Sequence, residues 1–123
     1  MNKKLSIDKL HFQPREPYGY WKSIIMTEDN FRQKGAKFQI IYFLGDKQVT
    51  PHYHKKTVEV FFVIGGEGII SINDHMNYCK TGDIVVCEPG DIHTFLPILK
   101  NEAFGIAIFK TNEEEGDIYN VEI

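Results

Sequence analysis

The sequence predicts an all-β fold, a sandwich or a barrel built from short strands. Runs rich in β-branched and aromatic residues recur along the chain, as at residues 38–44 and 58–64. Clusters of Gly, Asn, Asp and Pro separate these runs at intervals of roughly 8–12 residues, a spacing typical of strands joined by turns. No window of about a dozen residues carries the i, i+3, i+4, i+7 apolar pattern of an amphipathic helix.

The N-terminal third is expected to begin irregularly and then to form two strands. Residues 1–20 contain two prolines and show little periodicity, so we expect an irregular arm that contains one short strand. A strand over residues 20–26 follows. Residues 27–30 are expected to form a turn, because Asp and Asn side chains bond to nearby backbone groups. The aromatic run at 38–44 is the next expected strand.

The rest of the chain alternates between apolar runs and turn residues. The acidic segment 113–117 is expected to be a solvated, loosely held tail, followed by apolar residues that could dock onto the barrel. The strands expected here cover residues 58–64, 69–72, 76–79, 84–87, 93–96 and 104–109.

Length and composition fit one domain, residues 1–123, and argue against several classes of function. The chain has 14 basic and 17 acidic residues and a net charge of -3, so it lacks the basic footprint of a nucleic-acid-binding protein. No run approaches the ~18 apolar residues of a membrane helix, and the N-terminus lacks the apolar segment of a secretory signal. Cys79 and Cys87 are too far apart for a CxxC motif. We therefore expect a cytoplasmic protein with no nucleic-acid or membrane partner, in which both thiols are inert core.

Two histidines separated by one residue mark the candidate site. On an extended chain His52 and His54 point to the same face, about 6.8 Å apart along the strand, so both imidazoles can reach one ion. Glu59 follows His54 by five positions and would face away on an unbroken strand. It can join the histidines only if the chain turns or bulges through residues 55–58, where two charged lysines make a break plausible.

A fourth candidate ligand, His93, comes from a separate segment. It follows the turn residues Pro89 and Gly90, and on the strand that begins there it shares the inward face with Phe95. Three imidazoles and one carboxylate suit Fe, Mn, Zn, Ni or Cu without selecting among them. Four protein ligands on an ion that accepts six leave open positions, as in catalytic metal sites.

These residues resemble the two cupin motifs. Gly45, His52, His54, Glu59 and Gly66 resemble the first motif, over about 45–66, although Gly45 stands one residue farther from His52 than is usual. The second motif lies at about 82–97 and is carried by Gly82, Asp83, Pro89, Gly90 and His93, with Glu88 where a proline usually stands. The resemblance implies a double-stranded β-helix, the cupin or jelly-roll barrel, with His52, His54, Glu59 and His93 as ligands of a divalent ion such as Fe, Mn, Zn or Ni.

The cupin resemblance leaves the reaction open, because the family includes isomerases, epimerases, dioxygenases, decarboxylases and non-enzymatic binders. We expect an enzyme that isomerises or oxygenates a small polar metabolite of the sugar- or keto-acid type. The alternatives are a small-ligand binding or sensing protein and a metal-free sugar epimerase or isomerase. No general base can be named. A homodimer is expected, because small barrels often hide their sheet edges by association.

Other polar side chains are weaker candidates. His11 in the arm and His75 in an expected turn are predicted to be exposed rather than ligands. Gln39 and Tyr42 could point into the barrel and act on a substrate, but their run is apolar on both faces, so its periodicity does not fix which of them faces inward.

Overall fold

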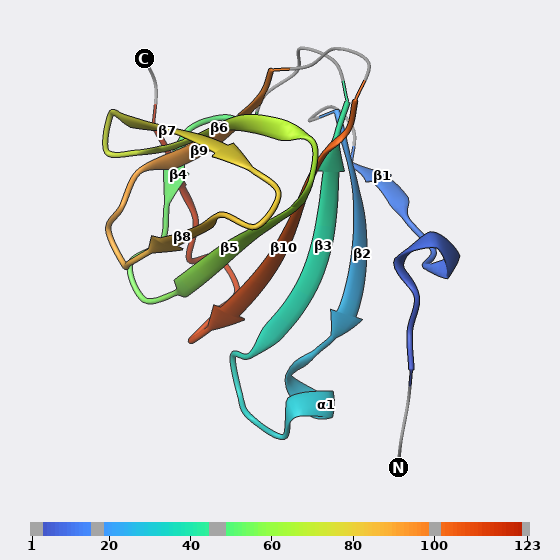
Figure 1. Ribbon diagram of the computed structural model, residues 1–123. Coiled ribbons are helices and arrows are strands. Elements are labelled where there is room, and N and C mark those ends of the chain that lie inside the picture. The colour runs from blue at the N-terminus through green and yellow to red at the C-terminus, as the bar shows by residue number, and fades with distance from the viewer. Residues whose placement is uncertain (1–3, 16–18, 45–48, 99–101, 122–123) are drawn as a thin grey trace.

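A computed structural model describes residues 4–15, 19–44, 49–98 and 102–121, and it confirms the all-β prediction (Figure 1). Within these residues no helix is long and apolar enough to cross a membrane. The elements in chain order are the 3-10 helix η1 (Ile7–Lys9), β1 (Gln13–Arg15), β2 (Tyr20–Met26), α1 (Glu28–Phe31), β3 (Lys37–Phe43), β4 (His52–Tyr53), β5 (Val58–Gly65), β6 (Glu67–Ile72), β7 (His75–Lys80), β8 (Ile84–Cys87), β9 (His93–Pro97), β10 (Phe104–Thr111) and β11 (Tyr119–Asn120).

The strands form two antiparallel sheets that face each other as the walls of a barrel. One sheet has the order β1-β2-β3-β10-β5-β8 and the other the order β11-β4-β9-β6-β7. Figure 1 shows β2, β3, β10 and β5 side by side, with β6, β7 and β9 forming the opposite wall. Neighbours such as β3 and β10 are distant in sequence, as in a double-stranded β-helix.

Strand alternation fills the space between the sheets with apolar side chains. Val63, Ile106 and Ile41 lie opposite one another across β5, β10 and β3 and are all buried. Phe43 and Phe104 are paired one step farther along and are fully buried. Burying such side chains contributes roughly 1.5–3 kcal/mol each, which is the main stabilising term of the barrel.

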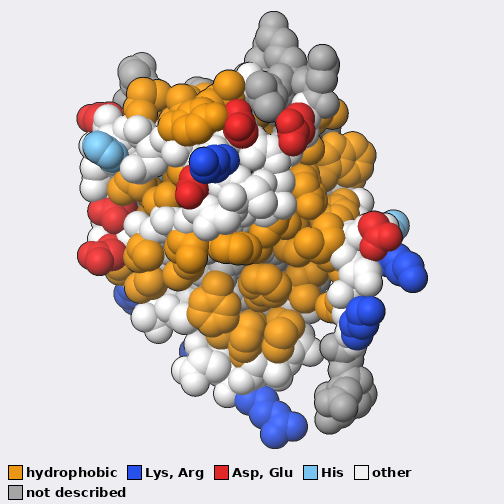
Figure 2. All heavy atoms as spheres, viewed as in Figure 1, with side chains coloured by type: hydrophobic (Ala, Val, Ile, Leu, Met, Phe, Trp, Pro, Cys, Tyr) orange, Lys and Arg blue, Asp and Glu red, His pale blue; other side chains and the backbone are white. Residues whose placement is uncertain are grey.

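The outer face of the six-stranded sheet is also apolar. Phe62, Ala107 and Ile40 form a row across β5, β10 and β3, and Ile84 extends the row onto β8. Phe62 and Ile84 are exposed. Figure 2 shows hydrophobic side chains gathered over these strands. Leu5 of the arm helps to line a groove on this face.

Two local predictions are wrong. The expected turn at 27–30 is the start of the single-turn helix α1, because the Asn30 side chain accepts a hydrogen bond from the Thr27 backbone N–H and caps its first turn. The expected solvated tail at 113–117 is instead tied to the barrel: Glu113 pairs with Lys37 at 2.6 Å and Asp117 is buried. Of the apolar residues expected to be able to dock, Val121 donates its backbone N–H to the Pro51 carbonyl at 2.8 Å, Ile118 is exposed, and Ile123 lies outside the described residues. Between Ile118 and Val121, β11 pairs with β4. The expected short strand in the arm is β1, which pairs with β2.

Candidate metal centre

The four side chains predicted as metal ligands lie together inside the barrel. β4 and the residue after it carry His52 and His54, and β9 places His93 directly opposite His52. The chain bends at residues 55–56, so β5 brings Glu59 toward the imidazoles, as the odd sequence spacing requires. The exposed fractions are 8% for His52, 9% for His54, 3% for Glu59 and 2% for His93.

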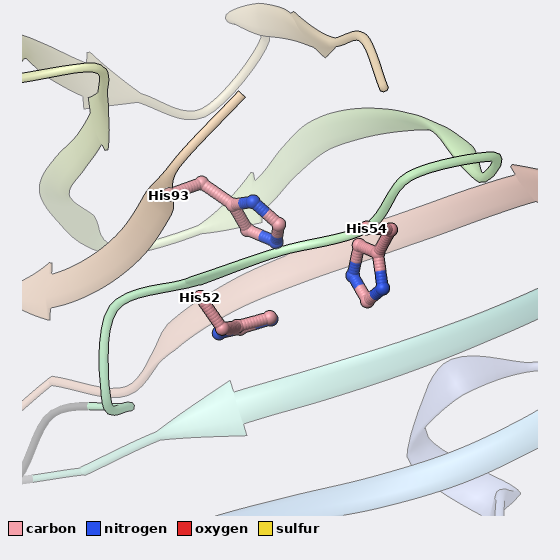
Figure 3. Close-up of side chains that lie close together, drawn as sticks. All are labelled: His52, His54 and His93. Atoms are coloured by element: carbon pink, nitrogen blue, oxygen red, sulfur yellow. The ribbon is translucent and has the colours of Figure 1, made fainter. Parts of the chain in front are cut away.

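The distances among these groups suit a single ion. The candidate ligand atoms of His52, His54 and His93 all lie within 4.8 Å of one another, and the three rings lean toward one another (Figure 3). The Glu59 carboxylate closes the group, with Oε1 2.9 Å from Nε2 of His54 and 3.3 Å from Nε2 of His93. A divalent ion about 2.1 Å from each donor fits among atoms so spaced.

Backbone carbonyls orient all three imidazoles. In each ring Nδ1 donates to a carbonyl oxygen, so in the neutral ring the proton lies on Nδ1 and Nε2 is left as a free lone pair. This is the usual outer-shell arrangement of metal-binding histidines. The hydrogen bonds join His52 to Thr50 at 2.8 Å, His54 to Asp117 at 2.7 Å and His93 to Asp91 at 3.1 Å.

The contact between His54 and Glu59 brings two hydrogen-bond acceptors together with no donor from the described residues between them. Nε2 of His54 and Oε1 of Glu59 are buried, and neither has a hydrogen bond to any described residue. Two acceptors at 2.9 Å require a proton or a cation between them. A single proton could serve only this pair, whereas one metal ion could serve all four donors. The residues therefore fit a metal ion.

The electrostatics hold His52 and Glu59 in their metal-binding forms at neutral pH, whereas without an ion they favour the protonated form of His54. Burial, reinforced by the neighbouring His93, lowers the pKa of His52 to about 4, so this imidazole is neutral. Burial alone would raise the pKa of Glu59, but the adjacent His54 and His93 nitrogens and the Lys110 charge outweigh it and hold that pKa well below its usual range. Burial likewise opposes protonation of His54, but Glu59 and the Asp117 carbonyl outweigh it and raise its pKa.

Asp117 is a supporting residue that the sequence did not reveal. Its carbonyl orients His54, and its carboxylate accepts the backbone N–H groups of Lys55 at 2.9 Å and Lys56 at 3.0 Å. It thereby fixes the bend that brings Glu59 to the histidines. No sequence signal distinguishes Asp117 from the acidic residues before it, because its contacts span 61 to 63 positions.

Cys87 lies beside the site as part of its wall. Its Sγ is 3.3 Å from Nδ1 of His93, and its ligand atom also lies within 4.8 Å of those of Glu59 and His93. Burial, with the negative charges of Glu59 and Asp91, raises the pKa of the Cys87 thiol to about 12, so in the absence of an ion the thiol is protonated. Cys79 is also free and buried, and both thiols pack in the core as expected.

The structure shows which of the remaining polar candidates face the inside of the barrel. Gln39 shares the inward face of β3 with Ile41 and is 4% exposed. The expectation that Tyr42 could face inward is wrong: it lies on the opposite face and packs edge-on against Phe12 at 5.4 Å. The apolar residues on both sides of β3 hid this difference. His11 and His75 are exposed, as predicted.

This fold is that of a cupin. The sequence matches the Cupin domain family over residues 40–101, about half of the chain, and the chain belongs to that family. No curated protein matches it.

Solved structures share the fold across most of the chain. KdgF from Halomonas sp. is 16% identical, with a TM-score of 0.74 over 94% of this chain and 98% of its own. The polyketide cyclase RemF from Streptomyces resistomycificus is 15% identical, with a TM-score of 0.81 over 100% of this chain and 87% of its own. A cupin-superfamily sugar phosphate isomerase from Silicibacter pomeroyi is 14% identical, with a TM-score of 0.77 over 98% and 83%. Similarity at these identities establishes the fold.

Proposed function

We propose that this cupin is a metal-dependent enzyme that isomerises or oxygenates a small polar metabolite of the sugar- or keto-acid type. Its ligands are His52, His54, Glu59 and His93, and its ion is Fe, Mn, Zn or Ni. The observation that carries the proposal is the buried pair of acceptors, Nε2 of His54 and Oε1 of Glu59, left without hydrogen bonds beside two further oriented imidazoles.

The chain's own residues hold the donors in place and pack against them on the inner side of the barrel. Phe61 packs against His93 with ring centroids 5.6 Å apart, and Phe95 packs against Phe61 at 4.9 Å. These rings restrict the imidazole and keep bulk water from the inner side of the site. A bound divalent ion would supply Lewis acidity toward a carbonyl or hydroxyl oxygen, or would bind oxygen beside a chelated substrate.

The structural neighbours support an enzymatic role. A polyketide cyclase and a sugar phosphate isomerase have this barrel at TM-scores of 0.81 and 0.77, so the architecture is compatible with catalysis on small metabolites. A metal-free epimerase is disfavoured, because the carboxylate beside the histidines is Glu59 at ligand distance and the nearby Tyr42 faces outward. A binding or sensing protein remains the alternative, in which the same ion only holds a ligand.

Metal analysis of protein purified without an affinity tag tests the site. We expect near-stoichiometric Fe, Mn, Zn or Ni in the wild type, loss of the metal in His52→Ala, and retention in the control His75→Ala, whose imidazole is exposed. Metal-free protein in which His52→Ala leaves the affinity for added ions unchanged would reject the site. Oxygen uptake or isomerisation with chelating acids supports the enzyme, whereas bound metal without turnover across such a screen supports the binder.

We also propose a cytoplasmic homodimer. Two free, buried cysteines suit a reducing compartment. The apolar outer face around Phe62, Ile84 and Val86 is the surface that a second copy would cover, because the same patch on two chains can pair about a two-fold axis. The arm residue Leu5 borders this face and could add to the contact.

A further inference from the structure

Lysines stand on the inner face of the six-stranded sheet, next to the candidate metal ligands. Lys110 on β10 lies directly opposite Glu59 on one side and Lys37 on the other. Lys22 on β2 lies opposite the core residue Ile41. Directly opposed residues in antiparallel strands share a face, so all three lysines belong to the barrel's inner side. A wall otherwise made of core residues thus carries several positive charges.

Two of these lysines already have acidic partners, whereas the third has none among the described residues. Lys37 pairs with Glu113 at 2.6 Å, and Lys110 lies 3.3 Å from Glu113 and 3.8 Å from Glu59. Lys22 is only partly exposed and forms no ion pair or hydrogen bond with any described residue. An ammonium group partly removed from water without a counter-ion costs free energy, which a bound anion would recover.

The charges around Lys22 are predominantly positive. Burial, together with the charges of Lys110, Lys37 and Arg15, lowers its pKa to about 8, and only Glu113 opposes them. At neutral pH its ammonium therefore remains charged. A divalent ion at the histidines would add further positive charge on the same face of the sheet.

Gln39 supplies a polar group on the same face. It lies one step along β3 from Ile41, so its row runs between that of Lys22 and that of Lys110. The side chain is 4% exposed, and its Oε1 is buried without a hydrogen bond to any described residue. A primary amide both donates and accepts, so it can bind a carboxylate oxygen or a hydroxyl group.

A groove of about 520 Å³ reaches the lysines of this wall that lie nearest the histidines, and it is lined by His54, Lys37 and Lys110 among others. Lys22 lines a second groove of about 510 Å³, together with Arg15 and Ser23. Two of the acidic residues that line the first groove already form ion pairs: Glu113 pairs with Lys37 and Lys110, and Glu114 pairs with Lys56 at 3.0 Å. Of the three lysines on this wall, Lys22 is therefore the one without an acidic partner among the residues that the structure describes.

We propose that the inner wall around Lys22 and Gln39 binds the distal carboxylate of a small hydroxy or keto diacid whose other oxygens point toward the histidines. Lys22 is the cationic anchor, and Gln39 is the hydrogen-bond partner of the same ligand. The assignment rests on the proposed function only for the end of the ligand that faces the histidines. The carboxylate site itself follows from the unpaired ammonium and the unbonded amide.

Matched ligands test the site by calorimetric titration of wild-type protein, both loaded with Mn and metal-free. Malate is compared with 2-hydroxybutyrate, and 2-hydroxyglutarate with 2-hydroxypentanoate; within each pair only the distal carboxylate is replaced by methyl. We expect at least one dicarboxylate to bind roughly tenfold or more tightly than its partner, the effect of one charge-assisted hydrogen bond. Lys22→Met should abolish the preference, Lys22→Arg should retain part of it, and the exposed control Lys80→Met should leave it intact.

The outcomes separate this proposal from the metal site. Equal binding within both pairs, no binding of any of the four acids, or a preference that survives Lys22→Met overturns the carboxylate site. If the preference for the dicarboxylate occurs only in metal-loaded protein and is unaffected by Lys22→Met, the ion binds the distal carboxylate, and the proposal is overturned. A preference in the metal-free protein, lost in Lys22→Met, supports it even if metal analysis rejects the metal site.

Discussion

The backbone carbonyl of Asp117 accepts a hydrogen bond from Nδ1 of His54 at 2.7 Å, across 63 positions of sequence. The same residue binds two backbone N–H groups of the bend that leads to Glu59. The C-terminal segment thus controls both the orientation of one imidazole and the position of the carboxylate next to it.

Replacing Asp117 by Ala should weaken metal binding without removing a ligand. The bend at residues 55–56 loses both acceptors, so His54 and Glu59 are held less firmly, and loss of outer-shell support of this kind typically costs about 10–100-fold in affinity. Competition with a chelating dye measures the change. The exposed neighbour Glu115→Ala serves as the control. Equal affinities for the two variants would show that the bend does not depend on Asp117.

Lys22→Met should stabilise the metal-free protein at pH 7. In the folded state the pKa of Lys22 is lowered to about 8 from 10.5, so the folded chain binds fewer protons between these values than the unfolded chain does. Wild-type stability therefore carries a penalty below pH 8 that disappears as the pH rises toward 10.5. The free energy of unfolding of Lys22→Met is expected to exceed that of the wild type by about 1 kcal/mol at pH 7, a value reduced to allow for the partial exposure of Lys22. This difference should shrink toward pH 10. Urea unfolding at several pH values measures it, and a gain independent of pH would contradict the assignment.

Gly66→Ala should destabilise the barrel strongly. Gly66 has a backbone φ of 68°, which residues with a side chain rarely adopt, and a Cβ there would collide with the backbone oxygen of Ala103. Gly82 has φ of 101° but open space around it, so Gly82→Ala reports backbone strain alone. In thermal or urea unfolding we expect the free energy of unfolding to fall by about 1 kcal/mol for Gly82→Ala and by roughly 2–4 kcal/mol for Gly66→Ala. Similar losses of stability in both variants would show that the backbone around Ala103 moves to accommodate the new methyl group at position 66.

Charge placed on the outer face should prevent dimer formation. Phe62→Asp puts a carboxylate in the middle of the apolar row, where a second copy would bury it. Light scattering after size exclusion should give a dimer for the wild type and a monomer for this variant. Met76→Asp, at an exposed position on β7 in the other sheet, should remain dimeric. A monomeric wild type would reject the dimer.

Much of the site could be predicted from local geometry. Strand alternation set His52 and His54 on one face, and the odd step to Glu59 required the bend that the structure has at residues 55–56. His93 followed from a Pro-Gly turn and its pairing with Phe95 on the inner face. Each of these inferences needed only a few neighbouring residues.

The rest depended on contacts that local patterns do not contain. Asp117 contacts the bend across more than 60 positions, so its segment reads as an ordinary acidic tail. Ile40 and Ile41 are both buried, on opposite faces of β3, so alternation could not decide between Gln39 and Tyr42. Lys37 and Lys110 have acidic partners and Lys22 has none within the described part of the chain, and this difference is visible only once β2, β3 and β10 lie side by side.

The pairing of β4 with β11 affects the order in which the protein comes apart. β4 and β11 have only two residues each, and β4 lies between β9 and β11. Strands with so few backbone hydrogen bonds open at a low free energy. Fraying of β11 would therefore free the histidine strand while Phe43 and Phe104 remain packed. We expect amide exchange near His52 and His54 to be faster than in β3 and β10, and bound metal to be released by this local opening well before the barrel unfolds.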